Sequence, residues 1–65
     1  MGSWETIFNE SNQTMTHTFS NGYVLNVHHN TGNYSLTRDG EVAETGILNI
    51  KVRDYKIFLQ GIADR

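Results

Sequence analysis

Cysteine is absent from this chain of 65 residues, so neither a disulfide bond nor a thiolate metal site can stabilise the fold. A chain this short forms one small domain at most, spanning residues 1–65. Such a domain hides only about 60% of the surface that its unfolded chain exposes, which makes it marginally stable alone. Small domains without a covalent or metal link depend on a well-packed core or on a partner subunit. We therefore expect a single domain that forms a homodimer.

Long apolar runs and an excess of one charge are also missing. No apolar run approaches the roughly 20 residues that a membrane span requires, and the first residues lack the pattern of a signal peptide. We therefore expect a cytoplasmic protein that does not enter a membrane. The net charge is −2, from 5 basic and 7 acidic residues, whereas proteins that bind phosphate backbones usually carry a basic face.

Sequence signatures of catalysis are missing as well. No G-x-S-x-G nucleophile motif occurs, and the glycines stand singly at turns rather than in a phosphate-binding loop. Glu41 and Glu44 differ in strand parity and so do not form an acid–base pair. His28 and His29 are adjacent and would point to opposite faces of a strand, which argues against a zinc site shared with His17. We expect no enzymatic activity, no cofactor and no metal ion.

The sequence does contain the alternation of apolar and polar residues that is typical of strands. Residues 14–19 and 23–28 alternate on either side of Asn21-Gly22. A two-residue Asn-Gly turn would place the two apolar sets on opposite faces of the sheet. A three-residue loop with a bulge at Gly22 places them on one face instead. This register pairs Phe19 with Tyr23, His17 with Leu25 and Met15 with Val27.

Two further turn signals extend the hairpin into a meander. Residues 30–33 (NTGN) predict a four-residue loop that places Val27 opposite Leu36. Residues 39–40 (DG) predict a third turn, for which we favour a three-residue loop that places Val42 opposite Leu36. Four strands in sequential order are therefore expected between residues 14 and about 44.

Both ends of the chain are ambiguous between helix and strand. Residues 4–10 fit either a strand or a helix, because their large apolar residues also recur at helical spacing. Residues 47–53 alternate apolar and polar side chains, which favours a strand, but a helix is the alternative because Leu48 and Val52 also begin an apolar stripe at helical spacing. Residues 55–63 are assigned to a helix, with a last strand as the alternative, and Asp54 is a candidate for its N-cap.

The predicted fold is mainly β, an antiparallel β-meander of four to five strands with one or two short terminal helices. An α+β arrangement is the alternative. The predicted core consists of Met15, Phe19, Tyr23, Leu25, Val27, Tyr34, Leu36, Leu48, Ile50, Val52 and Leu59.

The predicted function is that of a small non-enzymatic protein-interaction module. Its size and composition are typical of phage or bacterial accessory proteins that bind and modulate a host protein. Apolar residues left over at the two ends predict the interface, which comprises Trp4, Ile7, Ile57 and Phe58. His17 is expected to be partly buried with a hydrogen-bond partner, or to line a groove whose binding depends on pH.

The alternative function is a weak single-stranded nucleic-acid-binding module. Aromatic residues interleaved with basic ones can stack on bases. The basic side chains available for phosphate contacts are Arg38, Lys51, Arg53 and Lys56. Tyr23 and Tyr34, however, fall on the face expected to be the core, which favours the protein-interaction function.

Overall fold

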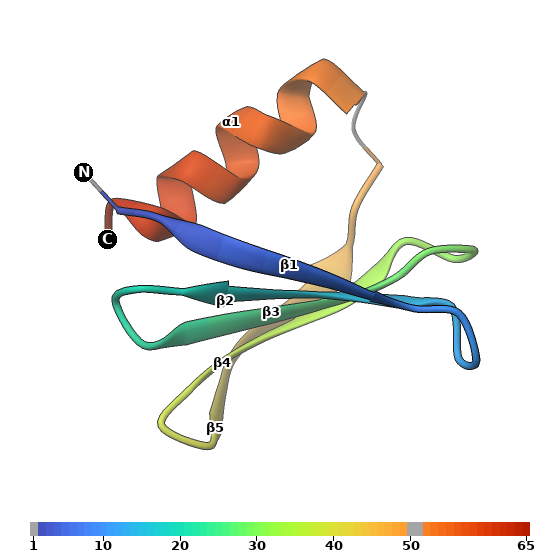
Figure 1. The fold of residues 1–65 in the computed structure, drawn as a ribbon, viewed down its shortest axis with the longest axis horizontal. Coiled ribbons are helices and arrows are strands. Elements are labelled where there is room, and N and C mark those ends of the chain that lie inside the picture. Colours follow the sequence, from blue (N-terminus) through green and yellow to red (C-terminus); the bar gives the residue numbers. More distant parts are fainter. Residues whose placement is uncertain (1, 50–51) are drawn as a thin grey trace.

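The computed structural model describes residues 2–49 and 52–65. These residues form five strands and one helix: β1 (Trp4–Asn9), β2 (Thr14–Phe19), β3 (Tyr23–His28), β4 (Asn33–Arg38), β5 (Glu41–Ile47) and α1 (Val52–Ala63). The strands make one antiparallel sheet in the order β1-β2-β3-β4-β5, so each strand pairs with its neighbour in the sequence (Figure 1). The predicted antiparallel meander with a terminal helix is confirmed.

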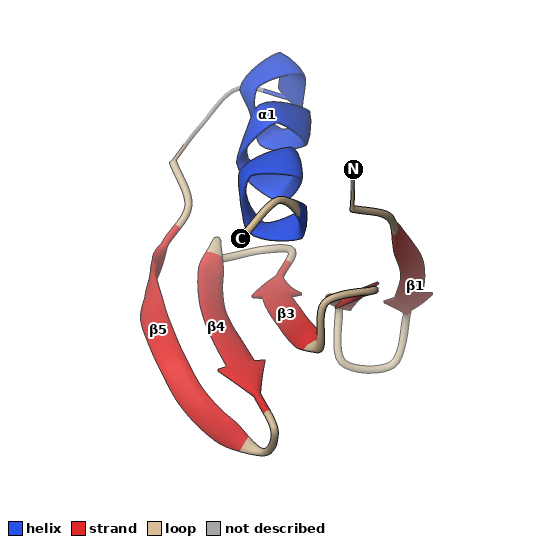
Figure 2. Ribbon diagram, turned by 90° about the vertical axis from the view of Figure 1, so that its left-hand side faces the viewer, coloured by secondary structure: helices blue, strands red, loops and turns tan. Residues whose placement is uncertain are grey.

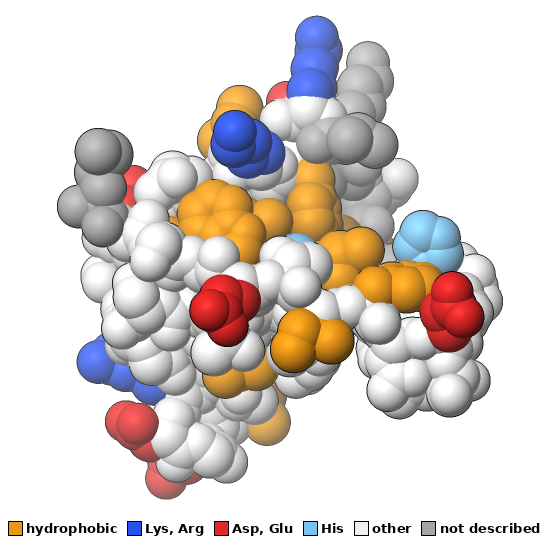
Figure 3. Space-filling view, viewed as in Figure 1, with side chains coloured by type: hydrophobic (Ala, Val, Ile, Leu, Met, Phe, Trp, Pro, Cys, Tyr) orange, Lys and Arg blue, Asp and Glu red, His pale blue; other side chains and the backbone are white. Residues whose placement is uncertain are grey.

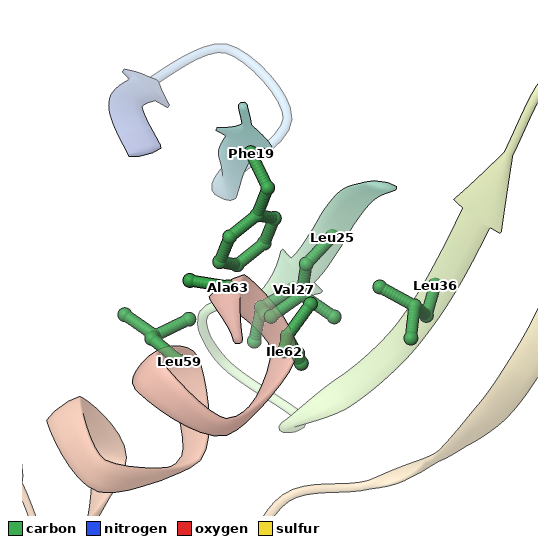
Figure 4. Close-up of a cluster of buried hydrophobic side chains, with 7 residues drawn as sticks. All are labelled: Phe19, Leu25, Val27, Leu36, Leu59, Ile62 and Ala63. Carbon is green, nitrogen blue, oxygen red and sulfur yellow. The ribbon is translucent and has the colours of Figure 1, made fainter. Parts of the chain in front are cut away.

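The helix covers one face of the curved sheet, as Figure 2 shows. Its apolar residues recur at the spacing of one helical face, from Tyr55 through Leu59 to Ile62. These side chains meet the apolar residues that alternate along the strands. The buried hydrophobic core comprises Phe19, Leu25, Val27, Leu36, Leu59, Ile62 and Ala63 (Figure 4).

The first predicted hairpin register is confirmed. Met15 lies opposite Val27 and His17 lies opposite Leu25. Gly22 has a φ of 95°, a conformation that favours glycine, and its N–H donates to the carbonyl of Phe19 at 3.2 Å. The Asn-Gly pair therefore belongs to a three-residue loop, and the apolar residues of both strands face the helix.

The predicted register of the second hairpin is wrong by two residues. Tyr34, rather than Leu36, lies opposite Val27, and Leu36 lies opposite Leu25. The loop occupies residues 29–32, where Gly32 adopts a φ of 80° and donates its N–H to the carbonyl of His28 at 2.8 Å. Since a glycine fits this left-handed position, the loop ends at Gly32 and the next residue begins β4. A shift of two residues keeps the same side chains on the core face.

The predicted contact between Val42 and Leu36 is also wrong. Asp39 and Gly40 form a two-residue turn with φ values of 54° and 81°, the combination that tight hairpins require. The register then shifts by one residue, so that Thr37 lies opposite Val42 while Leu36 lies opposite Glu44. This irregularity is a β-bulge, and it leaves Val42 exposed on the face away from the helix.

The ambiguous ends are resolved differently from one another. Residues 4–9 form a strand, so the helical alternative is wrong for them. The strand predicted for residues 47–53 is wrong, because β5 ends at Ile47 and α1 begins at Val52; residues 50–51 lie outside the described residues. The helix predicted for residues 55–63 is confirmed. Asp54 lies in the first turn of α1 rather than at the N-cap position. In the first turn its carboxylate still interacts favourably with the helix dipole.

The core prediction is correct for the strands and incomplete for the helix. The predicted residues that are buried are Phe19, Leu25, Val27, Leu36 and Leu59. Those that are half-buried are Met15, Tyr23, Tyr34 and Leu48. The side chains of Ile50 and Val52 lie outside the described part of the structure. Ile62 and Ala63 are buried without having been predicted, because the last turn of α1 packs against the sheet.

The two ends of the chain lie side by side (Figure 1). The backbone N–H of Gly2 donates to Asp64 Oδ1 at 3.3 Å. The side-chain amide of Asn21, in the β2–β3 loop, donates to the carbonyls of Ile62 and Ala63 at 2.8 and 3.3 Å. This amide satisfies carbonyl groups that a helix C-terminus leaves free, and it fixes the end of α1 to the sheet.

Candidate functional site

Strand β1 is an outer strand of the sheet, and its hydrogen-bonding pattern can be read from the structure. Trp4 lies opposite Phe19, and continuing this register by one residue sets Ser3 against Ser20. The N–H of Ser20 donates to the carbonyl of Ser3 at 2.9 Å, so this pair is of the hydrogen-bonded kind. In an antiparallel ladder, hydrogen-bonded and non-hydrogen-bonded pairs alternate. The pair of Trp4 with Phe19 is therefore non-hydrogen-bonded.

The alternation assigns a direction to every backbone group of β1. The residues that turn their N–H and C=O groups toward β2 are Glu5, Ile7 and Asn9. The residues that turn them outward, to the free edge, are Trp4, Thr6 and Phe8. Along this edge, the N–H and C=O groups of three alternate residues are thus available to bond to an additional strand.

Apolar side chains flank the outward-facing backbone groups. Ile7 is 66% exposed on the face away from the helix, and Phe8 is 43% exposed on the face toward it. Trp4 is half-buried and packs against Phe19, with ring centroids 5.7 Å apart. Figure 3 shows hydrophobic side chains on the side of the molecule where β1 and α1 lie. A segment that pairs with β1 would therefore cover apolar surface as well as backbone groups.

Strand β1 lacks the features by which proteins commonly protect a sheet edge. Its register with β2 is unbroken, and Glu5 is its one charged residue. The other outer strand, β5, carries a β-bulge and two charged residues, Glu41 and Glu44. Bulges and charges discourage the addition of another strand. The edge of β1 is therefore the more open of the two.

The four predicted interface residues do not form one patch. Trp4 and Phe58 are half-buried against the core, and Phe58 contacts Tyr34 with ring centroids 5.8 Å apart. Ile7 lies on the open face of the sheet, whereas Ile57 is 70% exposed on α1. Because residues 57–59 are helical, Phe58 and Leu59 face the sheet and Ile57 faces solvent. The structure therefore places Trp4 and Ile7 on the same strand but on opposite faces of the sheet, and it places Ile57 on α1.

His17 is a buried polar residue of the core, with 2% of its surface exposed. Its Nδ1 lies 2.8 Å from Thr6 Oγ1, and its Nε2 lies 2.7 Å from the hydroxyl of Tyr55. A neutral imidazole donates from one nitrogen and accepts at the other, and a hydroxyl can take either role. The three side chains thus form one hydrogen-bonded chain that links β1, β2 and α1.

Burial shifts the pKa values of His17 and Tyr55, the two titratable side chains in this hydrogen-bonded row. It lowers the pKa of His17 below the usual 6.5, because a buried imidazole is less stable when charged. It raises the pKa of Tyr55 above the usual 10.0 for the corresponding reason. Both groups are therefore neutral near pH 7. The hydrogen-bond partner predicted for His17 is confirmed, but the side chain is fully rather than partly buried, and both of its nitrogens are hydrogen-bonded within the fold.

A cavity of about 470 Å³ opens beside the first turn of α1. Its lining residues are Met15, Val27, His28, His29, Gly32, Leu48 and Tyr55. The lining is mainly apolar, and His17, which is hydrogen-bonded to Tyr55, is not one of the lining residues. Within residues 2–49 and 52–65, no cluster of three or more His, Cys, Asp or Glu residues could hold a metal ion. In the described part of the chain, no helix is long and apolar enough to cross a membrane.

Among the described basic residues of the alternative function, Arg38 lies on β4, apart from Arg53 and Lys56, which are neighbours on α1. Arg38 lies at the end of β4, with its guanidinium 5.1 Å from the ring centroid of Tyr23. Arg53 lies at the start of α1, 3.8 Å from a carboxylate oxygen of Asp54, and Lys56 is exposed on the same helix. Lys51 lies outside the described residues. Tyr23 is also contacted by Arg65, at 5.7 Å, so its ring is engaged within the protein.

Sequence reasoning missed two parts of this arrangement. Thr6 and Tyr55 were not identified as the partners of His17, and the backbone edge of β1 was not identified as a binding surface. The alternation of Trp4, Thr6 and Phe8 on one side of a strand was the available signal for Thr6, whereas no local pattern indicated Tyr55 or the free edge. Comparisons with protein-family models, with curated proteins and with solved structures find no match to this chain.

Proposed function

We propose that this chain is a small non-enzymatic protein-interaction module that binds an extended segment of a partner protein along the free edge of β1. The partner, as for phage or bacterial accessory proteins, would be a host protein whose activity the module modulates. The observation that carries the proposal is the row of outward-facing backbone groups at Trp4, Thr6 and Phe8. The exposed side chains of Ile7 and Phe8 support it.

The binding mode is addition of a sixth strand to the sheet. Backbone hydrogen bonds to the edge supply affinity, and the side chains beside the edge supply selectivity. Trp4 and Phe8 lie on the helix side of β1, whereas Ile7 lies on the open side. A partner segment with apolar residues on both of its faces would therefore be preferred over one that is polar on either face.

A library of displayed extended peptides tests the proposal, with two variants of one residue as probes. Phe8→Pro removes the outward N–H of residue 8, and proline is tolerated in outer strands when its N–H position faces solvent. Phe8→Ala removes the same exposed ring and keeps the N–H. We expect selected peptides to bind the wild type and Phe8→Ala, and to lose at least about tenfold in affinity for Phe8→Pro, because a bound strand needs that donor.

Circular dichroism must show that both variants keep the sheet. The proposal is wrong if peptides selected on the wild type bind the two variants equally well. It is also wrong if chemical-shift changes on peptide binding avoid the amides of Trp4, Thr6 and Phe8.

A further inference from the structure

We propose that the edge of β1 is occupied, in the absence of another partner, by β1 of a second copy of this chain. The two strands would run antiparallel about a two-fold axis that passes beside Thr6. This inference rests on the proposed function, because it uses the same edge. It goes further by naming the occupant and the register of pairing.

The backbone of β1 allows few registers for such a pair. Outward-facing groups at Trp4, Thr6 and Phe8 must meet outward-facing groups of the second strand. A register that differs by one residue sets them against groups that already bond to β2. The register centred on Thr6 satisfies all three, since Trp4 then faces Phe8 of the partner subunit and Thr6 faces Thr6 of the partner subunit. A shift of two residues in either direction leaves the backbone groups of one of these three residues without a partner, because that residue then lies past the end of the other strand.

The side chains agree with the same register. On the helix side, Trp4 lies beside Phe8 of the partner subunit, which gives two aromatic pairs. On the open side, Glu5 lies beside Ile7 of the partner subunit, so the two Glu5 carboxylates are not directly opposed. Direct opposition of like charges would be unfavourable. Ile7 and Phe8, now 66% and 43% exposed, would lose contact with water.

The other outer strand is a poorer occupant. Strand β5 carries two carboxylates, Glu41 and Glu44, and charged residues in an outer strand discourage the addition of another strand. The bulge in β5 also breaks the regular spacing of its backbone. Such a contact would be heterologous and would extend into a filament, whereas the β1–β1 contact closes after two copies. The closed dimer leaves the bulged, charged β5 at both ends of the joined sheet.

Single cysteine variants can test the register, because the natural chain contains no cysteine. Opposed residues in antiparallel strands have Cα atoms about 4.5–5.5 Å apart, which is within the range that a disulfide spans. We expect a mixture of Glu5→Cys and Ile7→Cys to give mainly the mixed disulfide dimer under mild oxidation. It should form at least about tenfold faster than the dimer of Ile57→Cys, an exposed control on α1, because pairing raises the local thiol concentration.

A register centred on Ile7 would give a different cross-linking result. In that case Ile7→Cys alone would cross-link rapidly, and the mixture would show no preference for the mixed product. This outcome would overturn the proposed register. Equal rates for all the variants, Ile57→Cys included, would overturn β1 pairing altogether.

Sedimentation equilibrium gives an independent measurement of the wild-type protein. We expect a mass of twice 7.4 kDa at high micromolar concentration, a return to 7.4 kDa for Phe8→Pro, and a dimer for Phe8→Ala. A monomeric wild type that still binds selected peptides would overturn the dimer and leave the proposed function standing. A dimer that persists in Phe8→Pro would show that the copies meet elsewhere.

Discussion

The two faces of the sheet are built from different side chains. The face beneath α1 carries large apolar residues together with His17, and all of the buried strand residues belong to it. The open face carries mainly hydroxyl and amide side chains, in rows such as Thr16, Asn26, Ser35 and Thr45. The threonines of β2 give this face its strand-forming character without requiring a covering layer. Folding free energy is therefore concentrated on one face, while the other remains in contact with water.

The largest expected effect comes from opening a cavity in the covered face. Leu25 is 0% exposed, so Leu25→Ala removes fully buried methyl groups between the sheet and α1. We expect the free energy of unfolding to fall by about 2–5 kcal/mol, measured by urea denaturation followed by circular dichroism. A loss below about 1 kcal/mol would mean that the core collapses around the smaller side chain, and the contrast between the faces would weaken.

Removing the tyrosine hydroxyl should have the next largest effect. Tyr55→Phe leaves Nε2 of His17 buried without a partner, and we expect a loss of about 1–3 kcal/mol in the same assay. Tyr34→Phe is the matched control, since it removes a hydroxyl that reaches Glu44 at 3.2 Å in a more open setting. Equal losses for the two variants would contradict a special role for the buried chain.

The covered face also explains which parts of the fold could be predicted from sequence. The register of the first hairpin followed from parity, because only one loop length places Met15, His17 and Phe19 beside the apolar residues of β3. The second register was not determined in this way, since loops over residues 29–32 and 30–33 both keep Tyr34 on the core face. The position of Gly32 decided between them. The bulge in β5 leaves Val42 exposed on the face away from the core, and the alternation of apolar and polar residues along the sequence does not predict it.

The candidate site was predictable to a smaller extent. Burial of His17 followed from its place between apolar neighbours on one strand face. Its partners are 11 and 38 residues away in the sequence, so only the folded arrangement brings Thr6 and Tyr55 to it. The free edge required two facts that sequence left open, namely that residues 4–9 form a strand and that this strand is outermost.

A pH titration of stability tests the role of the buried His17 in the covered face of the sheet. Because burial lowers the pKa of His17 in the folded protein, the unfolded chain binds more protons below pH 6.5. The contribution of neutral, buried His17 to stability is therefore fully present above pH 6.5 and is lost as the pH falls through the lowered pKa of the folded state. Urea midpoints between pH 7.5 and 5 should show this slope for the wild type, and His17→Gln should flatten it. An unchanged slope in His17→Gln would assign the pH dependence to other groups.

The smallest expected effect belongs to the open face. Thr18→Val replaces an exposed residue of β2 by another that suits strands, and we expect a change within about 0.5 kcal/mol. Urea denaturation alongside Leu25→Ala would measure both faces in one experiment. A destabilisation above about 1 kcal/mol would show that the open face contributes to folding as well.

The adjacency of Gly2 and Asp64 has a consequence for how this unit can be joined to others. Because the chain enters and leaves the fold at one point, a short linker can connect its ends at a small cost in loop-closure entropy. New termini can then be opened in the exposed β1–β2 turn, residues 10–13, which would turn β1 into the last element of a circularly permuted chain. The same geometry allows the whole domain to be inserted into a surface loop of another protein, with the free edge of β1 still accessible.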